Sequence, residues 1–254
     1  MKKRLIIGNW KMYVETPQKA TAFAKELRAK MRSLPNVEVG LAPSYTLLSA
    51  VAEALKRSTI KMGAQGVSRY HADAHTGEVS AKMLKEAGVS FVIVGHSERR
   101  ALGETEEVVR TQMMEVGEAG LTVVLCVGEK ERDASGDYFT FIKQQLTSAL
   151  VGLNKKTLSK LVVAYEPVWA IGKTAVDAMK PHEIQETIIY IRKVLTEVQG
   201  REQALKIPIL YGGSVEAENA SAIIKEGGVS GFLVGHASAN IETFLPILKA
   251  LKNG

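Results

Sequence analysis

Eight short apolar segments recur along this chain, and helix-like segments separate them. In chain order they are Arg4–Gly8, Val37–Ala42, Thr59–Ala64, Phe91–Gly95, Leu121–Val127, Leu161–Tyr165, Ile207–Tyr211 and Gly231–Val234. Several are continuously apolar rather than alternating, which is typical of strands buried on both faces of a parallel sheet. The pattern therefore predicts an α/β protein built on eight parallel strands.

The segments between these runs carry helix signals. Thr16 before Pro17 is a typical helix start and predicts a helix over Pro17–Met31. A helix over Pro181–Val198 would place five apolar residues on one face: Ile184, Ile188, Ile191, Leu195 and Val198. A last helix would do the same with Phe244, Ile247, Leu248 and Leu251. Glycines at 88, 120, 227 and 228 stand where helices should end.

Nothing divides the 254 residues, because no Pro/Ser-rich linker or low-complexity block interrupts them. We therefore expect one domain over residues 1–254. Eight β/α units in a row favour a closed (β/α)8 barrel, which commonly uses about 250 residues. A doubly wound open sheet is the alternative, and the pattern alone decides only weakly between the two.

Composition excludes several classes of protein. The net charge is +6, but Lys and Arg are spread along the chain, without the basic arm or stripe that nucleic-acid binding needs. A mild positive field would favour a small anionic substrate, although an unbiased solvated surface explains the charge equally well. The one cysteine, Cys126, lies in an apolar run and is expected to be buried. No apolar run is long enough for a signal peptide or a membrane span, so a cytoplasmic enzyme is expected.

Chemistry-bearing residues follow the apolar runs directly. Active sites of such barrels lie at the carboxyl ends of the strands, so these residues should share one rim. They are Asn9 and Lys11 after the first run, His96 and Ser97 after the fourth, Glu166 after the sixth, Gly212, Gly213 and Ser214 after the seventh, and Gly235 and His236 after the eighth. A base, an imidazole, a cation and two glycine-containing loops suit proton transfer beside a phosphate group.

Six short strings in the chain occur in a familiar order and spacing between residue 5 and about residue 248. They are GNWKM at 8–12, GAQ at 63–65, TGEVS at 76–80, VGHSERR at 94–100, YEPVWAIG at 165–172 and YGGSV at 211–215. Together they resemble the signatures of the triosephosphate isomerase family. That resemblance implies the fold called the TIM barrel and reversible interconversion of dihydroxyacetone phosphate and D-glyceraldehyde 3-phosphate, without a cofactor.

The resemblance also implies roles for four residues. Glu166 would be the general base, a carboxylate made more basic by a closed, dry site. His96 would polarise the carbonyl and relay protons as a neutral imidazole, beside a helix opened by Ser97–Arg100. Lys11 would place a cation against the developing enediolate and the phosphate, and Asn9 would donate a hydrogen bond to a substrate oxygen.

Further residues are assigned by the same resemblance. Ser97 would hold Glu166 in the open state of the enzyme. Glu98 would fix residues of the site without touching the substrate itself. The phosphate would lie against backbone N–H groups, since glycine allows close approach and a helix N-terminus favours an anion. These groups belong to Gly172, Ser214, Gly235 and His236.

Two departures from the family pattern stand out. The family usually has two glycines after the eighth strand, and here the second position is His236, which retains the backbone N–H. The lid after Glu166 lacks two residues, because Gly172 is followed directly by Lys173-Thr174-Ala175. We expect Val176–Lys180 to take over part of the C-terminal hinge and lid closure to be retained.

The segment Arg69–Glu78 corresponds to the loop with which family members contact a second subunit. Thr76 matches the threonine that reaches the neighbouring site, so the resemblance implies a homodimer. The histidines at 71, 75, 182 and 236 share no helical spacing and have no cysteine partner, and no metal site is expected.

Two other functions fit parts of the pattern. Another phosphosugar isomerase of the same fold would keep the phosphate loops but lack the combined Asn9, Lys11, His96 and Glu166. A barrel that binds phosphate ligands without catalysis would have no need of a base placed for proton abstraction. Nucleic-acid binding ranks far behind both.

Overall fold

The computed structural model describes residues 3–71, 73–133, 135–173 and 178–253, and within them all strands are parallel and close into one barrel in chain order. The strands are β1 (Arg4–Asn9), β2 (Val37–Ala42), β3 (Lys61–Ala64), β4 (Phe91–Val94), β5 (Thr122–Val127), β6 (Leu161–Tyr165), β7 (Ile209–Tyr211) and β8 (Gly231–Val234). The predicted closed barrel is confirmed, because β8 pairs with β1. An open sheet would leave both strands with a free edge.

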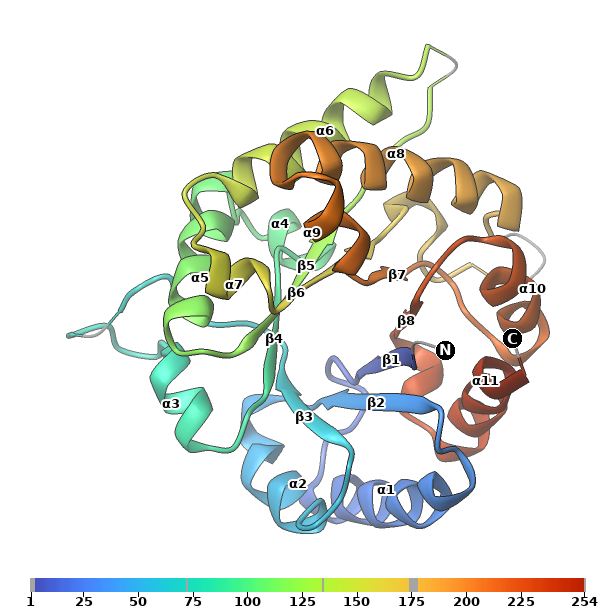
Figure 1. Cartoon of the computed structure of the whole chain (residues 1–254). Coiled ribbons are helices and arrows are strands. Elements are labelled where there is room, and N and C mark those ends of the chain that lie inside the picture. Colours follow the sequence, from blue (N-terminus) through green and yellow to red (C-terminus); the bar gives the residue numbers. More distant parts are fainter. Residues whose placement is uncertain (1–2, 72, 134, 174–177, 254) are drawn as a thin grey trace.

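Helices surround the strands (Figure 1). The α-helices are α1 (Pro17–Lys30), α2 (Leu48–Ala54), α3 (Ala81–Glu86), α4 (Ser97–Ala101), α5 (Glu106–Glu118), α6 (Asp137–Leu150), α7 (Lys155–Leu158), α8 (Pro181–Gln199), α9 (Arg201–Lys206), α10 (Ala217–Glu226) and α11 (Ile241–Asn253). Short 3-10 turns are η1 (Met31–Ser33), η2 (Tyr45–Leu47), η3 (Val168–Ala170) and η4 (His236–Ser238). No helix in the described part of the chain is long and apolar enough to cross a membrane.

Local sequence explains where the helices begin and end. The Thr16 hydroxyl accepts a hydrogen bond from the Lys19 N–H at 3.3 Å, so it caps α1 as its position before Pro17 predicts. Gly88, Gly120 and Gly228 have φ of +87°, +75° and +67°. Each adopts the left-handed conformation that lets the chain leave a helix and enter the next strand.

The apolar core has two layers. The outer layer lies between the strands and the helices, and the inner layer fills the barrel. Phe91 lies across the inside of the barrel above two glycines. A Cβ would come within 2.7 Å of its ring at Gly40 and within 2.1 Å at Gly63, so both positions exclude larger residues. This packing fills part of the barrel interior with apolar side chains.

The strand and helix predictions differ from the structure in a few places. β3 begins at Lys61 rather than Thr59 and β7 at Ile209 rather than Ile207, because the residues before them make no ladder with a neighbouring strand. On α8, Val198 is partly exposed although the rest of its predicted stripe is buried, since it lies in the last turn of the helix. Cys126 is fully buried, as expected.

Candidate active site

A cavity of about 280 Å³ opens at the carboxyl ends of the strands. The loops after β1, β4, β6, β7 and β8 all contribute to its wall. Among the lining residues are Asn9, Lys11, His96, Glu166, Gly172, Ser214, Gly235 and His236. The structure therefore brings together the residues that the sequence predicts for proton transfer and those predicted for phosphate binding.

Glu166 stands at the end of β6 and is almost fully buried. Its Oε1 lies 3.1 Å from Nε2 of His96, and its Oε2 accepts a hydrogen bond from the backbone N–H of Ser97 at 3.1 Å. The Glu166 N–H donates to the carbonyl of Val127 at 2.8 Å, which ties this position to the end of β5. Two donors therefore hold a buried carboxylate that faces the cavity.

His96 is the residue before α4, and its ring is buried. Nδ1 accepts a hydrogen bond from the backbone N–H of Glu98 at 3.2 Å, so this nitrogen carries no proton. The ring proton must then be on Nε2, where it can be donated to Glu166 or to a ligand oxygen. The geometry thus selects a neutral imidazole with one defined tautomer.

Lys11 has a φ of +45°, an unusual conformation for a residue other than glycine. Neighbouring groups hold it there: its N–H donates to Asn9 Oδ1 at 3.2 Å, and the Gln65 amide donates to its carbonyl at 2.9 Å. The same Gln65 nitrogen donates to the Ala42 carbonyl at 2.9 Å. Lys11 Nζ pairs with Glu98 Oε1 at 2.6 Å, which positions the ammonium at the cavity wall.

Backbone donors line another part of the cavity wall. Within the part of the chain that the structure describes, the N–H groups of Gly172, Ser214 and Gly235 donate to no protein acceptor. The Ser214 hydroxyl is already engaged, because it donates to the Ala170 carbonyl at 2.9 Å. The His236 side chain is exposed and packs edge-on against Tyr13, with ring centroids 5.1 Å apart. The loops after β6, β7 and β8 therefore offer hydrogen-bond donors to an anion in the cavity.

The sequence was also compared with those of known proteins and protein families. The sequence model of a family described as triosephosphate isomerase matches residues 4–251. A triosephosphate isomerase from Carboxydothermus hydrogenoformans is 42% identical, and the match covers 98% of this chain and 99% of the relative. A triosephosphate isomerase from Geotalea uraniireducens is 41% identical, over 98% of this chain and 99% of the relative. One from Flavobacterium johnsoniae is 39% identical, over 99% of this chain and 100% of the relative. The chain belongs to the triosephosphate isomerase family. The resemblance predicted from its motifs is confirmed.

One buried residue beside this cavity of the triosephosphate isomerase family member lies in none of the motifs named above. Glu129 is buried, and its Oε1 accepts hydrogen bonds from Tyr165 Oη at 2.9 Å and from Trp169 Nε1 at 2.8 Å. Arg132 Nε lies 3.3 Å from the same oxygen. Burial and the Glu129 charge raise the pKa of Tyr165 well above its usual value, so its hydroxyl stays a donor. Glu129 is the second residue after β5. This position at the carboxyl end of a strand is the sequence signal that marks it as a residue near the site.

Two expectations fall outside the cavity or outside the described residues. Thr76 is exposed on the segment between β3 and α3 and does not line the site. Residues 174–177 lie outside the described residues, so the shortened lid and the predicted hinge over Val176–Lys180 stay predictions. The structure describes the lid only as far as Lys173, which lines the cavity beside Gly172.

Proposed function

We propose that this chain interconverts dihydroxyacetone phosphate and D-glyceraldehyde 3-phosphate in the cavity at the carboxyl ends of the strands, as its family does. One observation carries the proposal. The Glu166 carboxylate, the protonated Nε2 of His96 and the anchored Lys11 border the same small cavity. This set suits proton abstraction next to a carbonyl better than binding alone, because a binder has no use for a buried base.

The reaction needs only proton transfers within the substrate. Glu166 takes a proton from C1 of dihydroxyacetone phosphate, and the electron pair of the C–H bond moves to form the C1–C2 double bond. His96 donates its Nε2 proton to the oxygen on C2 and takes the proton of the C1 hydroxyl. Glu166 then returns its proton to C2, which leaves an aldehyde at C1 and restores both side chains.

Lys11 and Asn9 stabilise the charge that develops in this reaction. An ammonium group beside the substrate oxygen lowers the energy of the enediolate more than that of the neutral ketone. Lys11 is suited to this because Glu98 fixes its position without filling the cavity. Asn9 is buried next to it, with its Oδ1 engaged by the Lys11 N–H and its amide nitrogen left to donate.

The phosphate of the substrate is assigned to the backbone donors of Gly172, Ser214, Gly235 and His236. Support comes from the N–H groups of the first three, which donate to no acceptor among the described residues. His236 begins η4, and the first N–H groups of a helical turn have no partner within it. We assign Ser97 the placement of Glu166 through its N–H, and Glu98 the placement of Lys11.

We also propose that the chain forms a homodimer. Large apolar side chains project from the loop after β1 and from the end of α4: Met12 is 86% exposed and Leu102 is 77% exposed. Met83 on α3 and Tyr13 are further exposed apolar groups on the first half of the barrel, and a second copy would cover such a surface. The segment between β3 and α3 leaves the barrel wall (Figure 1). Thr76 lies on this segment and would reach the partner. We expect the barrel to act as one domain in the cytoplasm.

Deuterium exchange tests the proposal directly. Dihydroxyacetone phosphate is incubated with the protein in D2O, and loss of the C1 proton signal is followed by NMR. The wild type should exchange this proton, whereas Glu166→Gln should reduce the exchange rate by at least ~10²-fold, the low end for a general base. Glu242→Gln, at an exposed carboxylate on α11, is the matched control and should behave as the wild type. A wild type that binds substrate without exchange would support a phosphate-binding protein instead.

A further inference from the structure

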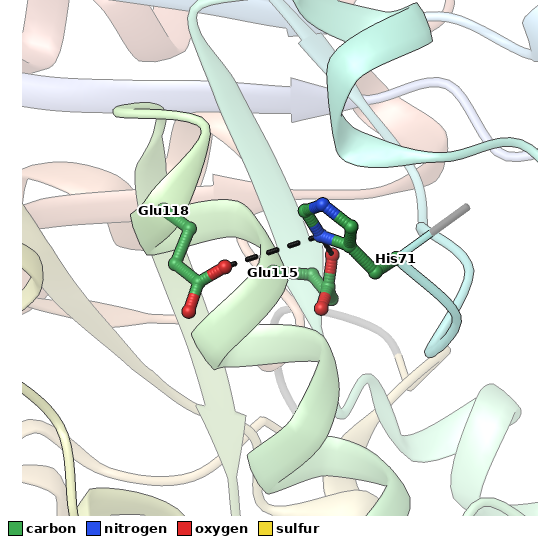
Figure 2. Close-up of side chains that lie close together, drawn as sticks. All are labelled: His71, Glu115 and Glu118. Atoms are coloured by element: carbon green, nitrogen blue, oxygen red, sulfur yellow. Dashed lines mark hydrogen bonds and ion pairs between the residues drawn. The ribbon is translucent and has the colours of Figure 1, made fainter.

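A second group of ligand-type side chains lies on the outer surface, away from the cavity. His71, on the segment between β3 and α3, approaches Glu115 and Glu118 on α5 (Figure 2). His71 Nδ1 is 3.0 Å from Glu115 Oε2 and 3.9 Å from Glu118 Oε2. One potential ligand atom from each residue falls within 4.8 Å of the other two. The nitrogen and both carboxylates therefore lie close enough together to bind one ion.

We propose that His71, Glu115 and Glu118 bind a divalent transition-metal ion of the Zn²⁺ type. Zn²⁺ binds nitrogen and oxygen ligands at about 2.1 Å, so two ligands at the tetrahedral angle lie about 3.4 Å apart. The observed separations of 3.0 and 3.9 Å from Nδ1 stand on either side of that value. Small side-chain rotations would therefore be enough to complete three ligand bonds, and water would take the fourth position.

The local charge favours a cation. Among the described residues, no Lys or Arg forms an ion pair with Glu115 or Glu118, and His71 is the one basic group that contacts them. The site is also accessible, because the His71 side chain is 77% exposed while Glu115 is 15% exposed. An imidazole combined with carboxylates suits Zn²⁺, whereas Mg²⁺ prefers a shell of oxygen ligands.

The sequence alone predicts no metal site, and the fold explains the difference. Glu115 and Glu118 are three residues apart on one face of α5, but His71 is 44 positions before Glu115. No local spacing connects them until the segment after β3 folds against α5. An ion at this place would join that segment, which carries Thr76, to the helical layer of the barrel.

Calorimetric titration of the metal-free, full-length protein with Zn²⁺ tests the proposal. We expect one saturable site per chain for Zn²⁺ and no comparable binding of Mg²⁺. His71→Ala and Glu118→Gln should each weaken Zn²⁺ binding by at least ~10-fold, since even residues behind metal ligands contribute this much. Zn²⁺ at about 100 times its Kd should raise the Tm by roughly 5–10 °C, and these substitutions should reduce that shift.

His75→Ala is the matched control, because His75 belongs to the same segment but stacks on Tyr70, with ring centroids 3.6 Å apart. It should bind Zn²⁺ as the wild type does. The proposal is wrong if no saturable binding occurs, if His71→Ala and Glu118→Gln bind normally, or if His75→Ala loses as much affinity. These results are independent of the proposed isomerase activity, since the readout is binding and the cluster lies outside the cavity.

Discussion

Gly128 offers a sharp test of how the fold positions the base. It follows β5, and a Cβ at this position would lie 1.8 Å from the carbonyl oxygen of Glu166 and 2.5 Å from its carbonyl carbon. Both atoms are backbone, so neither can rotate away. A carbon–oxygen contact needs about 3.3 Å. Gly128→Ala must therefore push the two strand ends apart by about 1.5 Å.

That displacement acts on the reacting carboxylate. A misplacement of about 1 Å at a catalytic group can reduce the rate by ~10²-fold. We expect Gly128→Ala to lower kcat by at least this factor and to change KM far less, because the phosphate donors after β7 and β8 stay in place. The overpacking should also cost roughly 1–3 kcal/mol of unfolding free energy.

Steady-state kinetics and thermal denaturation of the same preparation measure both effects. Gly66→Ala is the control, since the nearest atom to its added Cβ is Tyr45 Oη at 3.4 Å, an ordinary contact. It should retain kcat and Tm. A Gly128→Ala protein that is folded and as fast as the wild type would show that activity does not depend on the position of Glu166 at this precision.

Three further predictions follow from single contacts. Glu98→Gln should lower kcat/KM by no more than ~5-fold in steady-state kinetics, because Glu98 is 59% exposed and its pair with Lys11 is worth under about 1 kcal/mol. A larger loss would contradict this weak pairing, and an unchanged kcat/KM would argue against any role of Glu98 in placing Lys11. Burial, reinforced by the nearby Glu166 charge, raises the pKa of the Cys126 thiol, so a thiol reagent should label it only after unfolding. Burial also raises the pKa of Tyr165 and Tyr211, so the stability present below pH ~10 should be lost as pH rises beyond it. Tyr211→Phe should weaken that loss in Tm measurements; an unchanged pH profile would contradict it.

Much of the fold and of the site is predictable from the sequence for one physical reason. In a parallel barrel the carboxyl ends of all strands meet at one rim, so reading the residue after each apolar run brings Asn9, His96 and Glu166 together without coordinates. The starts of β3 and β7 are less predictable. Ile207 is apolar and buried like the strand residues that follow it, although the pairing of β7 with β6 begins only at Ile209. An apolar residue before a strand therefore looks the same in the sequence as the first residue of the strand.

Contacts between distant segments are what the sequence leaves open. The pairing of Lys11 with Glu98 spans 87 positions, and it depends on the register of β1 and β4 around the barrel. Glu129 carries no motif of its own, and its role depends on Tyr165 and Trp169 turning toward it. The approach of His71 to α5 likewise depends on the path of a loop, which hydrophobic periodicity does not encode.

Glu166 is proposed to perform the proton transfer of a triose phosphate isomerisation. A coupled assay of D-glyceraldehyde 3-phosphate conversion, run on the wild type and on Glu166→Ala, tests it most directly. We expect turnover by the wild type, a loss of at least ~10²-fold in the variant and an unchanged fold by circular dichroism. A folded wild type without turnover, or a variant as active as the wild type, would contradict it.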